Sequence, residues 1–185
     1  MLIEKGAEVD ARDEEGNTPL LMATALTRTV NYEAADIISR SWRPWHKIII
    51  EHGTDTNATK SIGETLLLEA VVRMREDFVR LLIDRAAEVK AGDHHEYTPL
   101  LMAAKRADRE VIVRLSLDRG ADVKARDDLG DTPLLVAASW ADSGVIVRLL
   151  IDQGADVNAR DNSGTTALSK VVVQLLIDKR AVEME

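Results

Sequence analysis

One sixteen-residue pattern occurs five times in this chain of 185 residues and constrains the fold more than any other feature. It runs from a small residue through a short acidic and aliphatic stretch to a turn and an apolar run led by threonine. The copies begin at Gly6, Gly53, Ala86, Gly120 and Gly154, so successive copies start 47, 33, 34 and 34 residues apart. A period near 33 residues is typical of solenoids, in which each repeat shares its hydrophobic core only with its neighbours. The sequence therefore predicts a stacked array.

The unit at residues 127–160 shows most clearly how each repeat is expected to fold. Gly130 provides a turn position that accepts positive φ without steric cost, and Thr132 is suited to cap a helix whose first residue is proline. A second apolar run over residues 145–151 predicts a second helix that is buried on more than one side. Gly154 then lies where a left-handed residue would end that helix. Each unit should contain a helix, a turn, a second helix and an extended, hairpin-like loop.

Composition agrees with thin layers of small helices and narrows the classes of partner. Hydrophobic residues make up 45% of the chain but aromatic residues only 3%, so the core must be built from aliphatic side chains. The 32 acidic residues outnumber the 24 basic ones and give a formal charge of −8, which disfavours nucleic acid as a partner. The chain has no cysteine, no apolar run long enough to span a membrane and no stretch typical of a secretion signal. These features predict a protein of the cytoplasm or another intracellular soluble compartment that does not bind membranes.

The repeated motifs resemble those of the ankyrin repeat family. The family's turn followed by TPL is matched at residues 16–21, 97–101 and 130–135, and its GADVNA motif is matched at residues 154–160. The resemblance covers nearly the whole chain. It implies an all-α solenoid of stacked antiparallel helix pairs, with hairpin-like loops that project from the stack.

The family pattern organises residues 1–185 as a single array. A half repeat, four full repeats and a truncated repeat are expected at residues 1–12, about 13–59, 60–92, 93–126, 127–160 and 161–185. The first full repeat carries an insertion near residues 27–45, because Thr18 to Gly53 spans 35 residues whereas Thr132 to Gly154 spans 22. This insertion contains two tryptophans. They either pack back on the array, which is favoured because it keeps them out of water, or belong to a functional loop.

Several positions depart from the family pattern. The histidine that usually follows TPL is replaced by Leu21, Leu68, Leu101, Leu135 and Ser169. Four of these residues are apolar, so burial should replace polar bonding between repeats. Ala86 replaces the glycine that ends a second helix, and Glu96 replaces the turn glycine, which predicts local backbone strain at both. Both ends of the chain resemble half repeats, so either polar end residues cap the array or the chain is a fragment of a longer one.

The resemblance also implies where a partner would bind. In the family, partners usually meet the concave face, which is built from the loop tips and the exposed side of the first helices. Mapped onto this sequence, the candidate partner-binding residues are Arg73, His94, His95, Tyr97, Lys105, Arg106, Leu129, Asp131, Ser139 and Trp140. Tyr97, Arg106 and Trp140 are of the types most often found as binding hot spots and belong to adjacent repeats. The alternative is that Trp140 only covers the end of its helix and Tyr97 only replaces a turn residue.

No residue pattern in the sequence predicts catalysis or a cofactor. It contains no carboxylate pair, Ser-His-Asp set or glycine-rich phosphate loop in a context that would give it a mechanism. His94 and His95 are adjacent, and a structural loop tip is favoured over weak metal binding there. We therefore predict a non-enzymatic module that binds another protein through a rigid concave surface, as a monomer. The alternative is a fragment that self-assembles or stacks within a longer array through open half-repeat ends, using Val171, Val172, Val173, Leu175 and Leu176.

Overall fold

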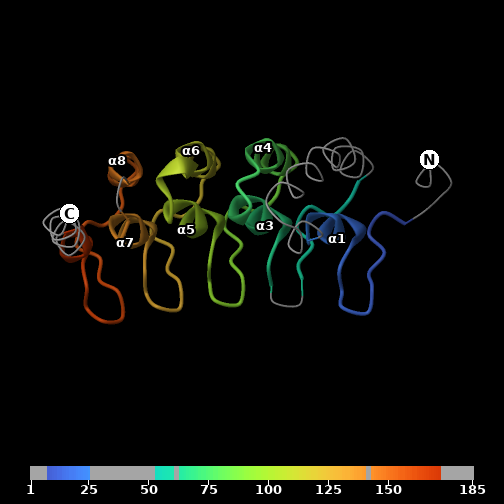
Figure 1. Ribbon diagram of the computed structural model, residues 1–185, viewed down its shortest axis with the longest axis horizontal. Coiled ribbons are helices and arrows are strands. Elements are labelled where there is room, and N and C mark those ends of the chain that lie inside the picture. Colours follow the sequence, from blue (N-terminus) through green and yellow to red (C-terminus); the bar gives the residue numbers. More distant parts are fainter. Residues whose placement is uncertain (1–7, 26–52, 61–62, 141–142, 172–185) are drawn as a thin grey trace, which may run out of the picture. The chain divides into compact units, whose positions relative to one another are not determined.

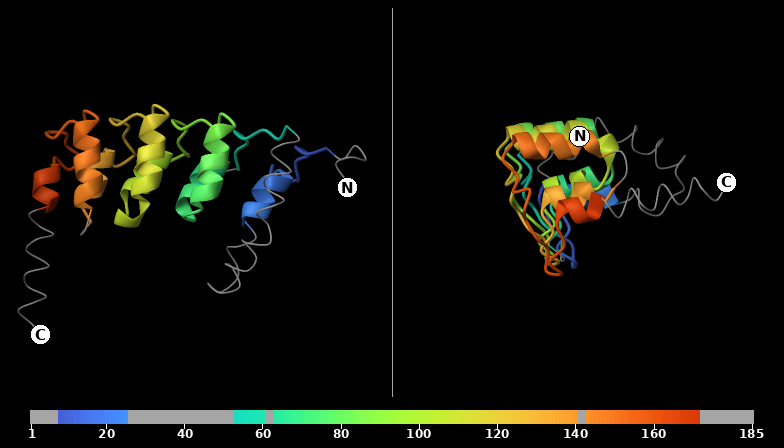
Figure 2. Two further views of the ribbon diagram at one scale, coloured as in Figure 1. Left: turned by 90° about the horizontal axis from the view of Figure 1, so that it is seen from above. Right: turned by 90° about the vertical axis from the view of Figure 1, so that its left-hand side faces the viewer.

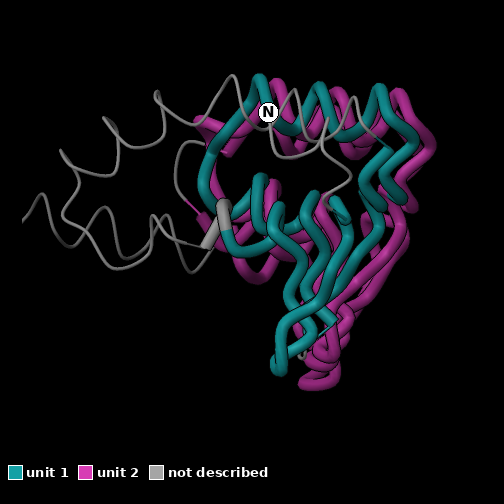
Figure 3. Tube along the Cα trace, turned by 90° about the vertical axis from the view of Figure 1, so that its right-hand side faces the viewer, with its two compact units in different colours: residues 1–88 teal, residues 89–185 magenta. Residues whose placement is uncertain are grey.

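The computed structural model describes residues 8–25, 53–60, 63–140 and 143–171. Within these ranges the chain is helical, with no strands and only two isolated β-bridges, Thr59–Thr65 and Arg160–Thr166. Backbone contacts divide the chain into unit 1, residues 1–88, and unit 2, residues 89–185 (Figure 3). The predicted insertion at 27–45 lies outside the described residues, and so do the apolar residues from 172 onward that the self-assembly alternative invokes.

Unit 1 contains three described helices, labelled in Figure 1. Helix α1 spans Pro19–Ala25, α3 spans Leu66–Val72 and α4 spans Glu76–Asp84. Helix α3 lies against both α1 and α4. The α3–α4 pair is the helix–turn–helix that the repeat pattern predicts, and its buried side chains are almost all aliphatic.

The described part of unit 2 contains two successive pairs of helices. The first pair consists of α5, Pro99–Ala104, and α6, Glu110–Asp118, joined by the short 3₁₀ helix η3, Ala107–Arg109. The second pair consists of α7, Pro133–Ala138, and α8, Gly144–Asp152. Helix α5 contacts α7, and α6 contacts α8, so the first helices form one layer and the second helices another. Figure 2 shows these two layers in unit 2, with the hairpin loops projecting to one side.

Threonine caps start the first helices, as the sequence predicts. The Thr132 hydroxyl accepts a hydrogen bond from the backbone N–H of Leu135 at 3.3 Å, and its backbone is extended. Thr65 and Thr98 cap α3 and α5 in the same way. Each cap satisfies one of the N–H groups that the first turn of a helix leaves without a partner. These caps explain why helices of six or seven residues begin at defined positions.

The second helices end in a residue with positive φ, whether or not it is glycine. Gly120 and Gly154 follow α6 and α8 with φ of 78° and 84°. Ala86 follows α4 with φ of 62°, and its N–H donates to the carbonyl of Ile83 at 3.1 Å in the same hydrogen-bonded end motif. The strain predicted at Ala86 is therefore present, and Met74, with φ of 56°, is a further strained position that the sequence pattern did not indicate.

The core is made of aliphatic side chains, including the leucines that stand where the family has histidine. Leu21, Leu68, Leu101 and Leu135 are each buried, which confirms the prediction that burial replaces polar bonding there. Ser169 is exposed at the same position and exchanges hydrogen bonds with the capping residue of its own repeat.

The prediction that the second helix of residues 145–151 is buried on more than one side is wrong for the described part of the chain. In α8, Ile146 and Leu150 are buried, whereas Val145 and Ile151 are exposed. The described helices against which α8 packs, namely α7, α6 and η3, all precede it in the chain. In α6, by contrast, Val113 is fully buried, whereas the equivalent residue of α8, Val147, is only half-buried.

Candidate functional site

The hairpin tips of unit 2 are held in shape by aspartates that bond to their own loop. In the hairpin that precedes α7, Asp127 Oδ1 accepts hydrogen bonds from the backbone N–H groups of Leu129 at 3.0 Å and Asp131 at 2.9 Å. Asp93 makes the two equivalent bonds in the preceding hairpin, at 2.9 and 3.0 Å. These carboxylates are used internally, so each tip presents its intervening side chains to solvent.

Tyr97 and Lys105 form a cation–π pair that joins a hairpin to the first helix of its own repeat. The Lys105 Nζ lies 4.2 Å from the centroid of the half-buried Tyr97 ring. The centroid of the His95 ring lies 6.3 Å from that of the Tyr97 ring, and the two rings are tilted relative to each other. Burial raises the pKa of the Tyr97 hydroxyl, and nearby carboxylates, Asp127 and Asp93 first among them, raise it further. The Tyr97 hydroxyl therefore loses its proton at a higher pH than a free tyrosine does.

Arg106 and Trp140 occupy the same position in two adjacent repeats. Each lies just beyond the end of its first helix, α5 for Arg106 and α7 for Trp140. The Trp140 side chain and backbone together are 53% exposed, so about half of this residue is open to solvent. Arg106 has a side chain that is 57% exposed, and its guanidinium forms two hydrogen bonds to Asp108, at 3.1 and 2.9 Å.

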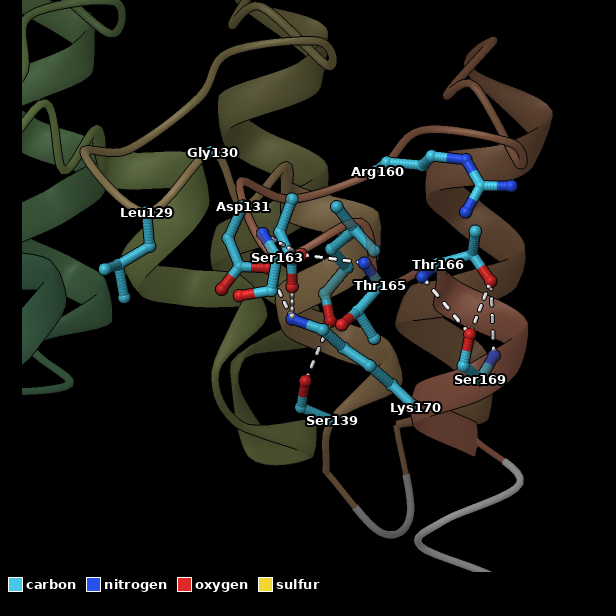
Figure 4. Close-up of polar contacts among 12 residues, drawn as sticks. Leu129, Gly130, Asp131, Ser139, Arg160, Ser163, Thr165, Thr166, Ser169 and Lys170 are labelled. Atoms are coloured by element: carbon cyan, nitrogen blue, oxygen red, sulfur yellow. Dashed lines mark hydrogen bonds and ion pairs between the residues drawn. The ribbon is translucent and has the colours of Figure 1, made fainter.

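Asp131, Ser139 and Lys170 come together at the carboxyl-terminal side of unit 2. Figure 4 shows the side chains of Asp131 and Ser139 directed toward the Lys170 ammonium group. Lys170 forms an ion pair with the Asp131 carboxylate and lies 3.5 Å from that of Asp161. Lys170 was not among the predicted site residues. Alignment of the repeats could have indicated it, because it places a charge where the preceding repeat has the apolar Val136.

Arg73 lies in unit 1 and is not the exposed residue that the family pattern predicts. Its side chain is half-buried and forms an ion pair with the buried Glu69, whose carboxylate also accepts from Lys60 Nζ at 2.8 Å. Burial alone would raise the pKa of Glu69, but hydrogen bonds from Lys60 and Arg73 outweigh burial, so the pKa is lowered. Lys60 also bonds to Glu64 at 3.0 Å. The guanidinium of Arg73 is engaged within the chain and is less available to a partner than the sequence suggested.

The remaining nine predicted residues all belong to the hairpins and first-helix ends of unit 2 and form part of its surface. His94 is exposed at its hairpin tip, and Leu129 is 61% exposed at the next tip. Lys105 and Ser139 are half-buried at the ends of their helices. We call this surface the α5–α7 face; it consists of His94, His95, Tyr97, Lys105, Arg106, Leu129, Asp131, Ser139 and Trp140.

Among the described residues, no group of three or more histidines, aspartates or glutamates is placed to hold a metal ion. No helix within the described ranges is long and apolar enough to cross a membrane. His94 and His95 belong to a hairpin tip in which the Nδ1 atom of His95 lies 3.1 Å from the Asp128 carboxylate.

Comparison with known proteins identifies the family. No curated protein matches the chain. A family model described as ankyrin repeats (3 copies) matches residues 45–127 and 100–182, which together cover well over half of the sequence. Repeats of this kind generally act as non-enzymatic modules for protein–protein interaction. The family match and the helix pairs of both units confirm the predicted helical repeat fold. The chain belongs to the ankyrin repeat family.

Proposed function

We propose that the α5–α7 face binds another protein, with Trp140, Arg106 and Tyr97 as its anchors. The observation that carries this proposal is the pair of half-exposed side chains at equivalent positions after α5 and α7. A tryptophan left more than half in water can bury a large apolar surface when a partner covers it. Tryptophan, tyrosine and arginine are also the residue types that most often dominate interface energies.

In the folded conformation, bonds around these residues order the surface before a partner binds. The Tyr97 ring is held by Lys105, and the backbone of its hairpin is held by Asp93. The carbonyl of Trp140 accepts a hydrogen bond from the Ser143 hydroxyl at 2.8 Å, which ties the end of α7 to the turn that follows. A surface ordered before binding loses less conformational entropy on association than a flexible one.

The proposal is tested by variants on the α5–α7 face and matched variants on the second helices. Proteins captured by the immobilised chain are identified by mass spectrometry, and the Kd of each is then measured by calorimetry. Trp140→Ala and Arg106→Ala should each weaken binding at least about tenfold, as expected for hot spots. Val145→Ala and Arg114→Ala are the controls, because these side chains are 51% and 52% exposed and Arg114 is ion-paired to Glu110 as Arg106 is to Asp108.

The control variants should change the Kd by less than about twofold. Equal losses from both sets would show that the partner meets another face, and no loss from Trp140→Ala would overturn the proposal. Circular dichroism of each variant separates loss of contact from loss of folding.

Self-assembly is the second candidate function, and one observation favours it. Exposed aliphatic side chains accumulate on α8 and in the residues that follow it: Val145, Ile151, Val157, Leu168 and Val171. If these side chains bind another copy of the chain, the molar mass from light scattering should rise over about a hundredfold range of concentration. Leu168→Glu should then restore a constant mass. A wild-type mass that stays at the monomer value at all concentrations excludes this alternative.

A further inference from the structure

The hairpin at residues 90–97 differs from the other hairpins of unit 2 at the positions that brace them. We call residues 90–97 the third hairpin and residues 124–131 the fourth hairpin. The two have the same length and the same arrangement, with a lysine at the first position, an alanine at the second and an aspartate at the fourth. They can therefore be compared position by position within one molecule.

The turn of the third hairpin contains a residue with a strained backbone. Glu96 has φ of 58°, whereas the equivalent residues Gly130 and Gly164 reach φ of 76° and 80°. A side chain in this left-handed region carries a steric penalty that glycine lacks. The turn hydrogen bond is still formed, since the Glu96 N–H donates to the Asp93 carbonyl at 2.9 Å. The surrounding loop therefore keeps Glu96 in its strained backbone conformation.

The third hairpin also lacks an arginine brace. In the fourth hairpin, Arg126 Nη1 donates to the carbonyl of Gly130 at 2.6 Å, and in the next hairpin Arg160 Nη1 donates to that of Gly164 at 2.7 Å. These bonds close the base of each hairpin onto its turn. The equivalent residue of the third hairpin is Gly92, which has no side chain to donate.

The bonds between neighbouring hairpins show the same difference. The fourth hairpin is tied to the next by three bonds: Asn162 donates to Leu129 and Asp128, each at 3.0 Å, and Arg126 donates to Arg160 at 2.8 Å. The third hairpin is tied to the fourth by a 3.3 Å backbone bond from Asp128 to His95 and by the contact between their side chains. Both of those side chains are mostly exposed, so their contact contributes little.

We propose that the third hairpin is a locally opening element, which leaves its folded conformation more often than the fourth hairpin while the helices of unit 2 stay formed. It carries His94, His95 and Tyr97, so each opening changes the shape of the α5–α7 face. Loops that open locally have few bracing bonds and exposed backbone, as this one does. The proposal stands apart from the proposed function, because opening is measured without any partner.

The two exposed lysines at equivalent positions allow a direct test by limited proteolysis. Lys90 and Lys124 are each followed by alanine and preceded by valine, so a lysine-specific protease meets nearly the same local sequence at both sites. Under native conditions, where cleavage reports the open population, the bond after Lys90 should be cut at least about fivefold faster than the bond after Lys124. Both rates are read from one digest of the full chain by mass spectrometry.

Two variants should each reduce the difference between the two cleavage rates. Glu96→Gly removes the strain and should slow cleavage after Lys90 by about fivefold without changing the rate at Lys124. Arg126→Gly removes the brace and should speed cleavage after Lys124 toward the rate at Lys90. Equal rates in the wild type, or faster cleavage after Lys124, would overturn the proposal.

Hydrogen exchange gives a second measurement on the same molecule. The N–H groups of Glu96 and Gly130 make equivalent turn bonds, at 2.9 and 2.8 Å, so a difference in their protection, once their intrinsic rates are corrected for, reports a difference in how often the two turns open. The proposal requires lower protection at Glu96 by about fivefold or more. Equal protection at the two sites contradicts it, even if a variant of the proteolysis series fails to fold.

Discussion

Replacement of Ala86 by glycine should stabilise the protein, although it removes a methyl group and creates no new contact. Ala86 follows α4 with φ of 62°, in the position that Gly120 occupies after α6. The two residues make the same helix-ending hydrogen bonds, so the surrounding backbone demands a left-handed residue at both. Alanine and glycine differ only in the conformational energy that this left-handed backbone requires.

The magnitude follows from two opposing terms. An L-residue in the left-handed region costs roughly 1–2 kcal/mol, which the Ala86→Gly substitution removes. Glycine has more conformational freedom in the unfolded chain, and this costs about 0.5–1 kcal/mol on folding. Ala86 is exposed, so its methyl group contributes little packing. The two terms leave a gain of about 0–1.5 kcal/mol in the free energy of unfolding, with a central value of about 0.7 kcal/mol.

The assay is urea unfolding followed by circular dichroism, with the reciprocal substitution Gly120→Ala as the control. A Cβ added at Gly120 meets no atom within 4 Å, so that substitution changes only the backbone term and should cost about as much as Ala86→Gly gains. The reasoning is refuted if Ala86→Gly is neutral or destabilising while Gly120→Ala shows its expected loss. An unchanged denaturant slope confirms that the comparison concerns stability alone.

Three further predictions test side chains that link repeats or respond to pH. Asn57 Oδ1 accepts a hydrogen bond at 2.8 Å from the backbone N–H of Glu88, just before the third hairpin, whereas the lysine side chain at the equivalent position 124 has no acceptor. Lys124→Asn should therefore add about 0.5–1.5 kcal/mol to the free energy of unfolding in urea, and no gain would show that this hydrogen bond cannot form in unit 2. Lys170→Met leaves the half-buried Asp131 carboxylate without its cation and should cost about 1–3 kcal/mol, whereas an unchanged midpoint would mean that water replaces the pair. Because the pKa of Tyr97 is raised in the folded state, its contribution to stability is present below pH 10 and is lost as the pH rises through the folded-state pKa. An absorbance titration should show a tyrosinate signal that appears above pH 10.0 and that Tyr97→Phe removes. Ionisation of Tyr97 at or below pH 10.0 would contradict this prediction.

Local rules explain why much of the fold could be predicted from the sequence. The cap at Thr132, the turn at Gly130 and the helix end at Gly154 each depend on residues within a few positions along the chain, and all three appear as expected. The strain at Glu96 follows from the same comparison between repeats. The left-handed backbone of Met74 did not follow, because the equivalent residue Ala107 begins a 3₁₀ helix instead.

The candidate site was harder to predict, because its side chains find partners that the repeat pattern does not specify. Arg73 and Arg106 occupy equivalent positions, yet Arg73 turns to a buried glutamate and Arg106 turns to an exposed aspartate. The difference arises at Glu69, which stands where the equivalent repeats have Met102 and Val136. A buried carboxylate is stable only when a cation is paired with it, and here Arg73 forms that ion pair with Glu69. Repeat alignment identifies the site positions, but the orientation of each side chain depends on charges in neighbouring positions.

The charges of the α5–α7 face are already satisfied within the chain, and this determines where binding energy can come from. Lys105 lies on the Tyr97 ring, and Asp131 is paired with Lys170. A charged group of a partner must displace such an internal pair, so its net gain is small. Trp140 and Leu129, by contrast, expose apolar surface. A partner that covers this surface displaces only water, so the burial stabilises the complex. Apolar surface at Trp140 and Leu129, together with the exposed Arg106, should therefore supply most of the affinity of the proposed interface. The pairs formed by Lys105 and Asp131 restrict which partners fit without leaving a buried charge unpaired.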